Sequence, residues 1–200
     1  MLNAYDVIVH VVQASPAIES ITLVTYLDGP NWGDQPHTRE EPDLKSLLEG
    51  LRKDRGPRLF TEVLRGDVSA QSLCNFAKRL NDNSLLGICS RVRLIDGGFA
   101  HIPMIDFMCG VSMTNLETLT HLLKDVAEGQ GCLLETGRSY HYYGFQLFDE
   151  VRWRIFLGKC LLMSGFTDDR YVGHQLVDGY CVLRLSSGKS KNLIPKVVAG

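Results

Sequence analysis

The chain has 200 residues, of which 44% are hydrophobic, and a formal net charge of −2 at pH 7 with a sequence pI of about 6.3. This length and hydrophobic share suit a single domain with a substantial core. The slightly acidic charge excludes a protein that holds long duplex DNA through many phosphate contacts, because such proteins are usually basic. A single nucleotide, or a local contact with nucleic acid, is compatible with this charge.

The six cysteines are scattered and form no Cys-x-x-Cys pair, which argues against a zinc site. Most of them have apolar neighbours, as buried free thiols do. No apolar run is long enough to span a membrane, and the chain starts without the basic segment of a secretory signal. We therefore expect a protein of the reducing cytoplasm with no membrane partner.

The first half of the chain predicts strands and helices in alternation. Strands are expected where β-branched and other apolar residues form short runs, at residues 7–12, 21–27, 59–64 and 85–94. Helices are expected where leucines recur at helical spacing over 44–51 and where Ser69 can cap an apolar face. The polar, proline-bearing segment 29–42 is expected to be a mobile loop.

The second half continues this mixture. The apolar run 99–107 is expected to form a hairpin with the preceding strand across the turn at 96–98. Thr114, with Glu117 three residues later, has the form of a capping box and predicts a helix start. The remaining predicted elements are a strand or strand-turn at 132–143, the longest helix at 145–163 and a last strand at 180–185. Strands and helices that interleave with hairpins place the chain in the α+β class, with a mixed or antiparallel sheet.

The segment between Gly137 and Gly144 carries the densest set of functional groups. In an extended strand alternate side chains share a face, so Ser139 and His141 should point the same way and Arg138 to the opposite face. A hydroxyl beside an imidazole suits an anionic group such as a phosphate. The alternative is a histidine packed in the core or at an interface. Three tyrosines of the same segment are expected to pack in the core: Tyr140, Tyr142 and Tyr143.

Two aspartates are candidate metal ligands. Asp106 ends an apolar run, and a lone acid at the end of a buried strand needs an ionic partner, hydrogen bonds or a metal ion. Asp169 follows the longest predicted helix. Two carboxylates brought together could hold Mg²⁺ or Mn²⁺, with substrate phosphates completing the coordination. The alternative for Asp168 and Asp169 is a role as turn or helix-cap residues.

The last predicted strand leads into a basic segment with small residues. Arg184 lies in the strand, and Lys189 follows a Ser-Ser-Gly turn whose backbone amides could meet phosphates together with the lysine. A loop with a solvated lysine is the alternative. His174 and Asp178 flank a predicted turn, and only a minor role is expected for them.

In chain order these segments resemble the archaeo-eukaryotic primase, or primase-polymerase, superfamily. The first motif of that family is an apolar strand ending in an acidic pair, and Asp106 matches its first acid. The second motif is Ser-x-His, matched by Ser139 and His141. The third is an apolar residue with an aspartate, followed downstream by a basic strand. Asp169 matches this aspartate, with Asp178 as a rival.

One position departs from the family pattern. The second acid of the first motif falls on Met108, and a thioether is a poor ligand for a hard cation such as Mg²⁺. The resemblance is therefore to a primase-like variant with a single aspartate in its first motif. Glu135 is a candidate to replace the missing ligand.

The resemblance implies one primase-like domain over residues 1–200, with an α/β module at 1–98 and the motif-bearing half at 99–200. It implies a catalytic core with an RRM-like mixed or antiparallel sheet flanked by helices. The implied activity is nucleotidyl transfer, in which nucleotides are added to a nucleic acid with the help of Mg²⁺ or Mn²⁺. Other protein subunits are implied as partners.

In such an enzyme Asp106 and Asp169 would hold the metal, and His141 would be the third catalytic residue. The implied nucleotide-binding residues are Arg138, Ser139, His141, Arg184 and Lys189. Met108 leaves open an inactive accessory subunit that keeps the pocket and binds a nucleotide or a nucleic-acid end. A further alternative is a protein interaction module without a ligand, docking through the helix of Trp153 or the loop 29–42.

Overall fold

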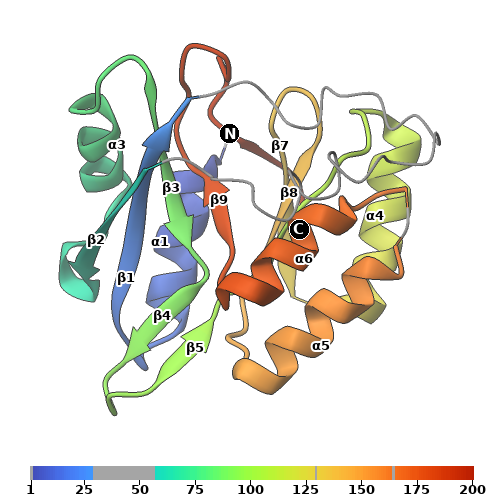
Figure 1. Ribbon diagram of the computed structural model, residues 1–200, viewed down its shortest axis with the longest axis horizontal. Coiled ribbons are helices and arrows are strands. Elements are labelled where there is room, and N and C mark those ends of the chain that lie inside the picture. Colours follow the sequence, from blue (N-terminus) through green and yellow to red (C-terminus); the bar gives the residue numbers. More distant parts are fainter. Residues whose placement is uncertain (1, 29–56, 129, 164) are drawn as a thin grey trace, which may run out of the picture.

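The computed structural model describes residues 2–28, 57–128, 130–163 and 165–200 of the chain. In these ranges two antiparallel sheets and the helices around them share one hydrophobic core (Figure 1). The α+β class expected from the sequence is confirmed. The helix predicted at 44–51 and the loop predicted at 29–42 lie outside the described residues.

The first sheet is built around β1 (Ile18–Leu27), which contains the strand predicted at 21–27. On one side of β1 lies β2 (Arg58–Leu64). On the other side β3 (Ser84–Cys89) and β4 (Arg91–Leu94) pair with β1 in succession. Beyond them lie β9 (Val182–Arg184), which pairs with β3, and β5 (Phe99–His101), which pairs with β4. A strand from the end of the chain thus joins a sheet formed mainly by the first half.

The strands of the second sheet, in order, are β10 (Lys196–Ala199), β7 (Gly131–Glu135), β8 (Tyr140–Gly144) and β6 (Met104–Asp106). The run 99–107, expected to form one strand of a hairpin, is divided: β5 pairs with β4 as predicted, whereas β6 pairs with β8. Pro103 lies at the division. It has no N–H for a ladder, and its carbonyl accepts a hydrogen bond of 2.7 Å from the N–H of Gly144. The chain therefore leaves the first sheet and carries Asp106 into the second.

The prediction of a strand at 7–12 is wrong, because these residues lie in helix α1 (Ala4–Ala14). Asn3 caps the helix by accepting hydrogen bonds from the N–H groups of Tyr5 and Asp6, and the Asp6 carboxylate accepts one from the N–H of Asn3. The residues that α1 buries recur at helical rather than alternating spacing: Ala4, Tyr5, Val7, Ile8, Val11 and Val12. The cap and the packing of this face outweigh the strand preference of valine and isoleucine.

The cap of helix α4 (Met113–Val126) lies two residues earlier than predicted, since Ser112 and not Thr114 is the capping residue. The side chain of Ser112 accepts a hydrogen bond from the N–H of Asn115. Tyr140 explains the shift, because its hydroxyl accepts from the Ser112 N–H and donates to the Ser112 carbonyl, both at 3.0 Å. The start of α4 is therefore fixed by a tertiary contact.

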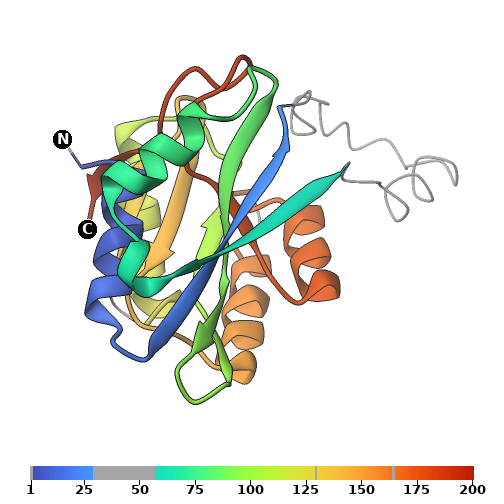
Figure 2. The ribbon, with the colours of Figure 1, turned by 90° about the vertical axis from the view of Figure 1, so that its left-hand side faces the viewer.

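The other helices are α3 (Ala70–Lys78), α5 (Glu150–Leu161) and α6 (Asp169–Asp178). Helix α3 follows Ser69 as predicted, and α5 begins after its cap Asp149, inside the longer segment predicted. Helix α6 corrects the turn predicted between His174 and Asp178. Figure 2 shows α1 and α3 on one side of the first sheet and α5 and α6 on the other.

Among the described residues, the core contains large side chains from both halves of the chain. The three tyrosines of β8 are buried as predicted, and Trp153 of α5 is fully buried. Among the residues that the structure describes, every helix is too short or too polar to cross a lipid bilayer.

Candidate functional site

Asp106 and His141 face each other across two paired strands. They are register partners in the antiparallel pair of β6 and β8, so their side chains lie on the same face of the sheet. The Oδ1 atom of Asp106 lies 3.5 Å from Nε2 of His141. Two residues 35 positions apart in the sequence therefore meet because β6 pairs within the second sheet.

The turn between β7 and β8 brings Ser139 to the same place. The N–H of Thr136 donates to the Ser139 carbonyl at 2.9 Å, and the Thr136 hydroxyl lies 3.2 Å from the Ser139 hydroxyl. Gly137 has a φ of 101°, a left-handed conformation that favours glycine. Arg138 lies in this turn, ahead of the first residue of β8, and lines the same cavity as Ser139. The expectation that it faces the opposite way is wrong, because strand alternation does not extend into the turn.

The opposite wall of the cavity comes from β9 and the loop that follows it. Arg184 is buried at the end of β9, and Lys191 lies in the loop. The cavity has a volume of about 200 Å³. Its polar lining residues are Tyr26, Asp106, Thr136, Arg138, Ser139, His141, Arg184 and Lys191, and its apolar ones are Leu85, Val182 and Leu183.

Lys189 is not among the residues that line this cavity. It lines a separate open groove with Lys78 and several asparagines, on the other side of the loop after β9. Lys191 lies in the cavity with Asp106 instead, although no sequence pattern distinguished it from Lys189. Both lysines belong to the same basic segment, and only the path of the loop distinguishes them.

The third aspartate also differs in position from the expectation. Asp169 is the first residue of α6 and does not line the cavity, and Asp178 is the last residue of that helix. Phe107 pairs with Thr167 in an antiparallel bridge, so one further step in the same register brings Asp168 opposite Asp106. Asp168 also caps α6, accepting hydrogen bonds from the N–H groups two and three residues later.

Burial and neighbouring charges shift the pKa values of the central pair. Burial raises the pKa of Asp106 to about 7, opposed by Lys191 and Arg184 and reinforced by the nearby negative charge of Asp168. Because 44% of the Asp106 side chain still faces the cavity, water in the cavity moderates this shift. Burial first, and then Arg184 and Lys191, lower the pKa of His141 well below its usual value, so His141 is neutral at pH 7.

The Nδ1 atom of His141 is buried and its hydrogen-bonding capacity is not satisfied within the described part of the chain. The side chain is buried, and its Nδ1 atom has no hydrogen-bond partner among the described residues. A buried polar atom without a partner is costly, so a group that enters the cavity and bonds to it is favoured.

A family model described as Archaeo-eukaryotic primase 1D-like matches residues 65–196, which is more than half of the chain. The chain belongs to this archaeo-eukaryotic primase-like family. The matched range contains every residue that lines the cavity except Tyr26. No curated protein and no solved structure matches the chain. The family resemblance inferred from the motifs is confirmed, while the single aspartate of the first motif stays a prediction.

Primase-like proteins generally use divalent metals. Among the described residues, no group of three or more His, Cys, Asp or Glu side chains is placed to hold a metal ion. Met108 is half exposed, and Glu135 does not line the cavity. Asp106 supplies a carboxylate in the cavity, and Asp168, which does not line the cavity, acts on Asp106 through its charge. The cations at the cavity suit phosphate more than a bare metal. These donors fit an ion that arrives with substrate phosphates, as Mg²⁺ often does.

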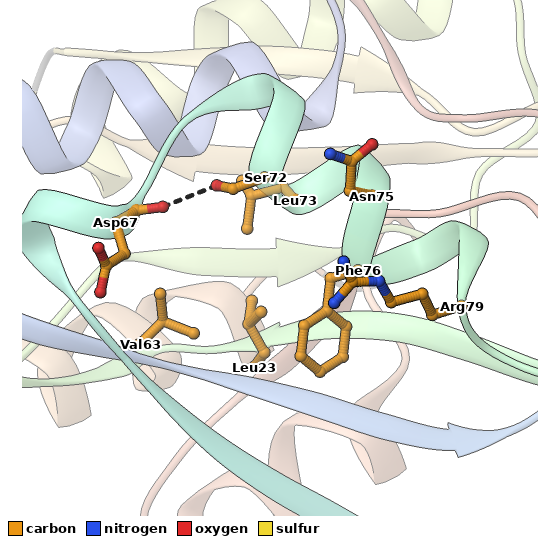
Figure 3. Close-up of a pocket in the computed structure, with 8 residues that line it drawn as sticks. All are labelled: Leu23, Val63, Asp67, Ser72, Leu73, Asn75, Phe76 and Arg79. Atoms are coloured by element: carbon orange, nitrogen blue, oxygen red, sulfur yellow. Dashed lines mark hydrogen bonds between the residues drawn. The ribbon is translucent and has the colours of Figure 1, made fainter.

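A second cavity of about 260 Å³ lies between α3 and the strands β1 and β2 (Figure 3). Its floor is apolar, formed by side chains such as Leu23, Val63 and Phe76. Asp67 and Arg79 lie at opposite ends of it, so no ionisable groups converge. None of the site residues predicted from the sequence lines this cavity, so the candidate site is the cavity beside Asp106.

Proposed function

We propose that this primase-like protein binds a nucleoside triphosphate in the cavity beside Asp106 and His141 and transfers the nucleotide to the 3′ end of a nucleic acid, releasing pyrophosphate. The main support is that side chains from separate chain segments line one small cavity: Asp106 of β6, Ser139 and His141 of the second motif, and Arg184 with Lys191 from the end of the chain. A polyphosphate is the ligand that suits this mixture of cations and hydrogen-bond donors.

The phosphates would lie between the turn before β8 and the loop after β9. Arg138 and Lys191 supply positive charge from the two walls, and the Ser139 hydroxyl donates a hydrogen bond. The negative charge of the triphosphate raises the pKa of His141, so that Nδ1–H can donate to a phosphate while Nε2–H donates to Asp106. His141 is then neutral without a triphosphate and positively charged when a triphosphate is bound.

Asp106 and Asp168 would hold a divalent ion that arrives with the triphosphate, and such an ion supplies charge neutralisation at the phosphates and activation of the attacking hydroxyl. Two pairs of substitutions distinguish these residues from those chosen on sequence alone. Asp169→Asn and Lys189→Ala should leave nucleotide binding close to that of the wild type. Asp168→Asn and Lys191→Ala should weaken it.

The direct test is incorporation of a labelled nucleotide onto a primed oligonucleotide template in the presence of Mn²⁺. The wild type should incorporate the nucleotide, and Asp106→Ala should reduce incorporation by a factor of 10² or more, on the order expected for the loss of a group that acts only in the transition state. Calorimetry with a non-hydrolysable triphosphate measures binding separately. Full metal-dependent incorporation by Asp106→Ala would contradict the assignment.

A second function, nucleotide binding without catalysis, is favoured by one observation. Met108 stands where the family has its second acid, and a reaction with two metal ions needs bridging carboxylates. In that case the wild type binds the triphosphate, with weaker binding by Ser139→Ala and His141→Ala, but incorporates nothing. Absence of binding at millimolar nucleotide would instead favour a protein interaction module.

A further inference from the structure

The guanidinium of Arg184 is occupied by backbone carbonyls. Its Nη1 atom donates to the carbonyl of Ser186 at 2.6 Å and to that of Leu193 at 2.5 Å, and Nη2 donates to the carbonyl of Thr136 at 3.2 Å. The residue is 6% exposed. A guanidinium has five N–H donors in a fixed plane, and these three bonds use both hydrogens of Nη1 and one of Nη2.

These three carbonyls belong to the two walls of the nucleotide cavity. Thr136 opens the turn that carries Arg138 and Ser139. Ser186 and Leu193 lie at the two ends of the loop that carries Lys191. One side chain therefore ties the second-motif turn to the loop after β9 and sets the distance between the groups that face each other across the cavity.

The tip of the same loop has an anchor of its own. The Asp28 carboxylate accepts a hydrogen bond of 2.7 Å from the N–H of Ser190 and another from the Ser190 hydroxyl. At Gly188 a Cβ atom would lie 2.7 Å from Oδ2 of Asp28 and 2.5 Å from Cδ2 of Leu85, so no larger residue fits without displacing them. The N–H of Gly188 also donates to the Lys191 carbonyl at 2.8 Å. The segment 186–193 is thus held at both ends and at its tip, with Lys191 toward the cavity.

We propose that Arg184 is a positioning residue: it holds the loop of Lys191 against the turn of Ser139, and its fork geometry matters more than its charge. This goes beyond the family-based expectation that Arg184 itself steadies the triphosphate. The part of this proposal that concerns triphosphate binding rests on the proposed function, whereas the part that concerns the position of the loop does not. A lysine at this position keeps the charge, yet a single ammonium cannot reproduce a planar fork that bridges three carbonyls.

Two measurements on Arg184→Lys test this, with Arg154→Lys as the matched control. Hydrogen–deuterium exchange of the amides of 186–193 is measured without any nucleotide, and triphosphate affinity is measured by calorimetry. Arg184→Lys should speed exchange in this segment roughly tenfold or more and weaken triphosphate binding about tenfold. Arg154→Lys should change neither by more than about twofold, because Arg154 is exposed on α5 and does not line the cavity.

The proposal is overturned if the amides of 186–193 exchange in Arg184→Lys at the same rate as in the wild type. It is also overturned if exchange is faster but triphosphate affinity is undiminished. The exchange measurement decides the structural part even where the wild type binds no nucleotide, which separates failure of this inference from failure of the proposed function. Should the Arg184 variants not fold, Ser190→Ala releases the loop at its exposed tip instead. This variant should speed exchange and weaken triphosphate binding, although Ser190 does not line the cavity. Faster exchange with unchanged triphosphate affinity would again overturn the proposal.

Discussion

Asp168 acts on Asp106 through its negative charge, which adds to the raised pKa of Asp106. The preceding residue, Thr167, pairs with Phe107 in an antiparallel bridge, and the N–H of Met108 donates a hydrogen bond of 2.8 Å to the carbonyl of Phe166. Backbone pairing thus brings a second carboxylate near Asp106 from a chain segment outside the first motif.

Asp168→Asn should lower metal-dependent triphosphate affinity on the order of tenfold, because a carboxylate that helps to hold the ion is lost. Asparagine is itself a good helix cap, so α6 keeps its start and the fold is not disturbed. Calorimetry with Mn²⁺ and a non-hydrolysable triphosphate measures the effect.

Without metal the same substitution should leave triphosphate affinity unchanged or slightly higher, since a negative charge near the phosphates is removed. Asp169→Asn is the control and should behave as the wild type in both conditions. The reverse pattern, with the loss at Asp169, would restore the choice made from sequence spacing.

Asp106→Asn should stabilise the metal-free protein above pH 7. The pKa of Asp106 is about 7 in the folded protein and 3.8 in the reference state, so between these values the folded state binds more protons and loses stability as the pH rises. The asparagine variant lacks this loss. Its gain in the free energy of unfolding should be about 1 kcal/mol at pH 8, well below the value for a fully buried carboxyl because the side chain is partly exposed.

Denaturant titration at pH 4 and pH 8 in the presence of a chelator measures the difference, which should vanish at pH 4. His141→Asn is the counterpart with the opposite sign. The folded pKa of His141 is lowered, so its contribution to stability is present above pH 6.5 and is lost as the pH falls below that value. An Asp106→Asn variant that is less stable than the wild type at pH 8 would contradict the burial of this carboxyl.

Gly87→Ala should destabilise the protein by about 1–3 kcal/mol, the range for overpacking a filled region. A Cβ atom at Gly87 would lie 2.9 Å from the carbonyl oxygen of Leu183, 2.9 Å from Cγ1 of Val182 and 3.0 Å from Cε1 of Tyr26. Three of the residues that line the cavity beside Asp106 would have to move, so the proposed triphosphate affinity should fall as well.

Gly158→Ala is the matched control, because no atom lies within 4 Å of the added Cβ atom in helix α5. Alanine is the better helix former, and the variant should gain about 0.5–1 kcal/mol. Thermal and denaturant unfolding of the two variants should therefore shift in opposite directions.

Ser90→Ala should destabilise the protein by roughly 1–3 kcal/mol, the cost of leaving a buried N–H group without a partner. The hydroxyl of Ser90 accepts a hydrogen bond of 2.8 Å from the N–H of Cys181 and lies 3.3 Å from Nδ1 of His101. His101 in turn lies 3.0 Å from Glu150 and stacks on Trp153, so this contact joins β9 to α5. Ser187→Ala, at an exposed position, should change the free energy of unfolding by less than about 0.5 kcal/mol.

The sequence by itself determined the α+β class, the strands β1 and β2, the start of α3 and the family. Each of these depends on local information: a run of β-branched residues bounded by turn residues, a serine before an apolar face, or short motifs in a fixed order. The sequence also singled out Asp106, Ser139 and His141, which lie together in one cavity.

Only the tertiary structure decided the rest. The run 7–12 could be a strand or a helix by composition, and the packing of α1 chose the helix. A strand register decides which of two adjacent aspartates comes opposite Asp106. The path of a loop decides which of two nearby lysines enters the cavity. Both are set by partners far away in the chain. A shift of one residue in a paired segment turns a side chain to the other face, and no local pattern in the sequence fixes that register.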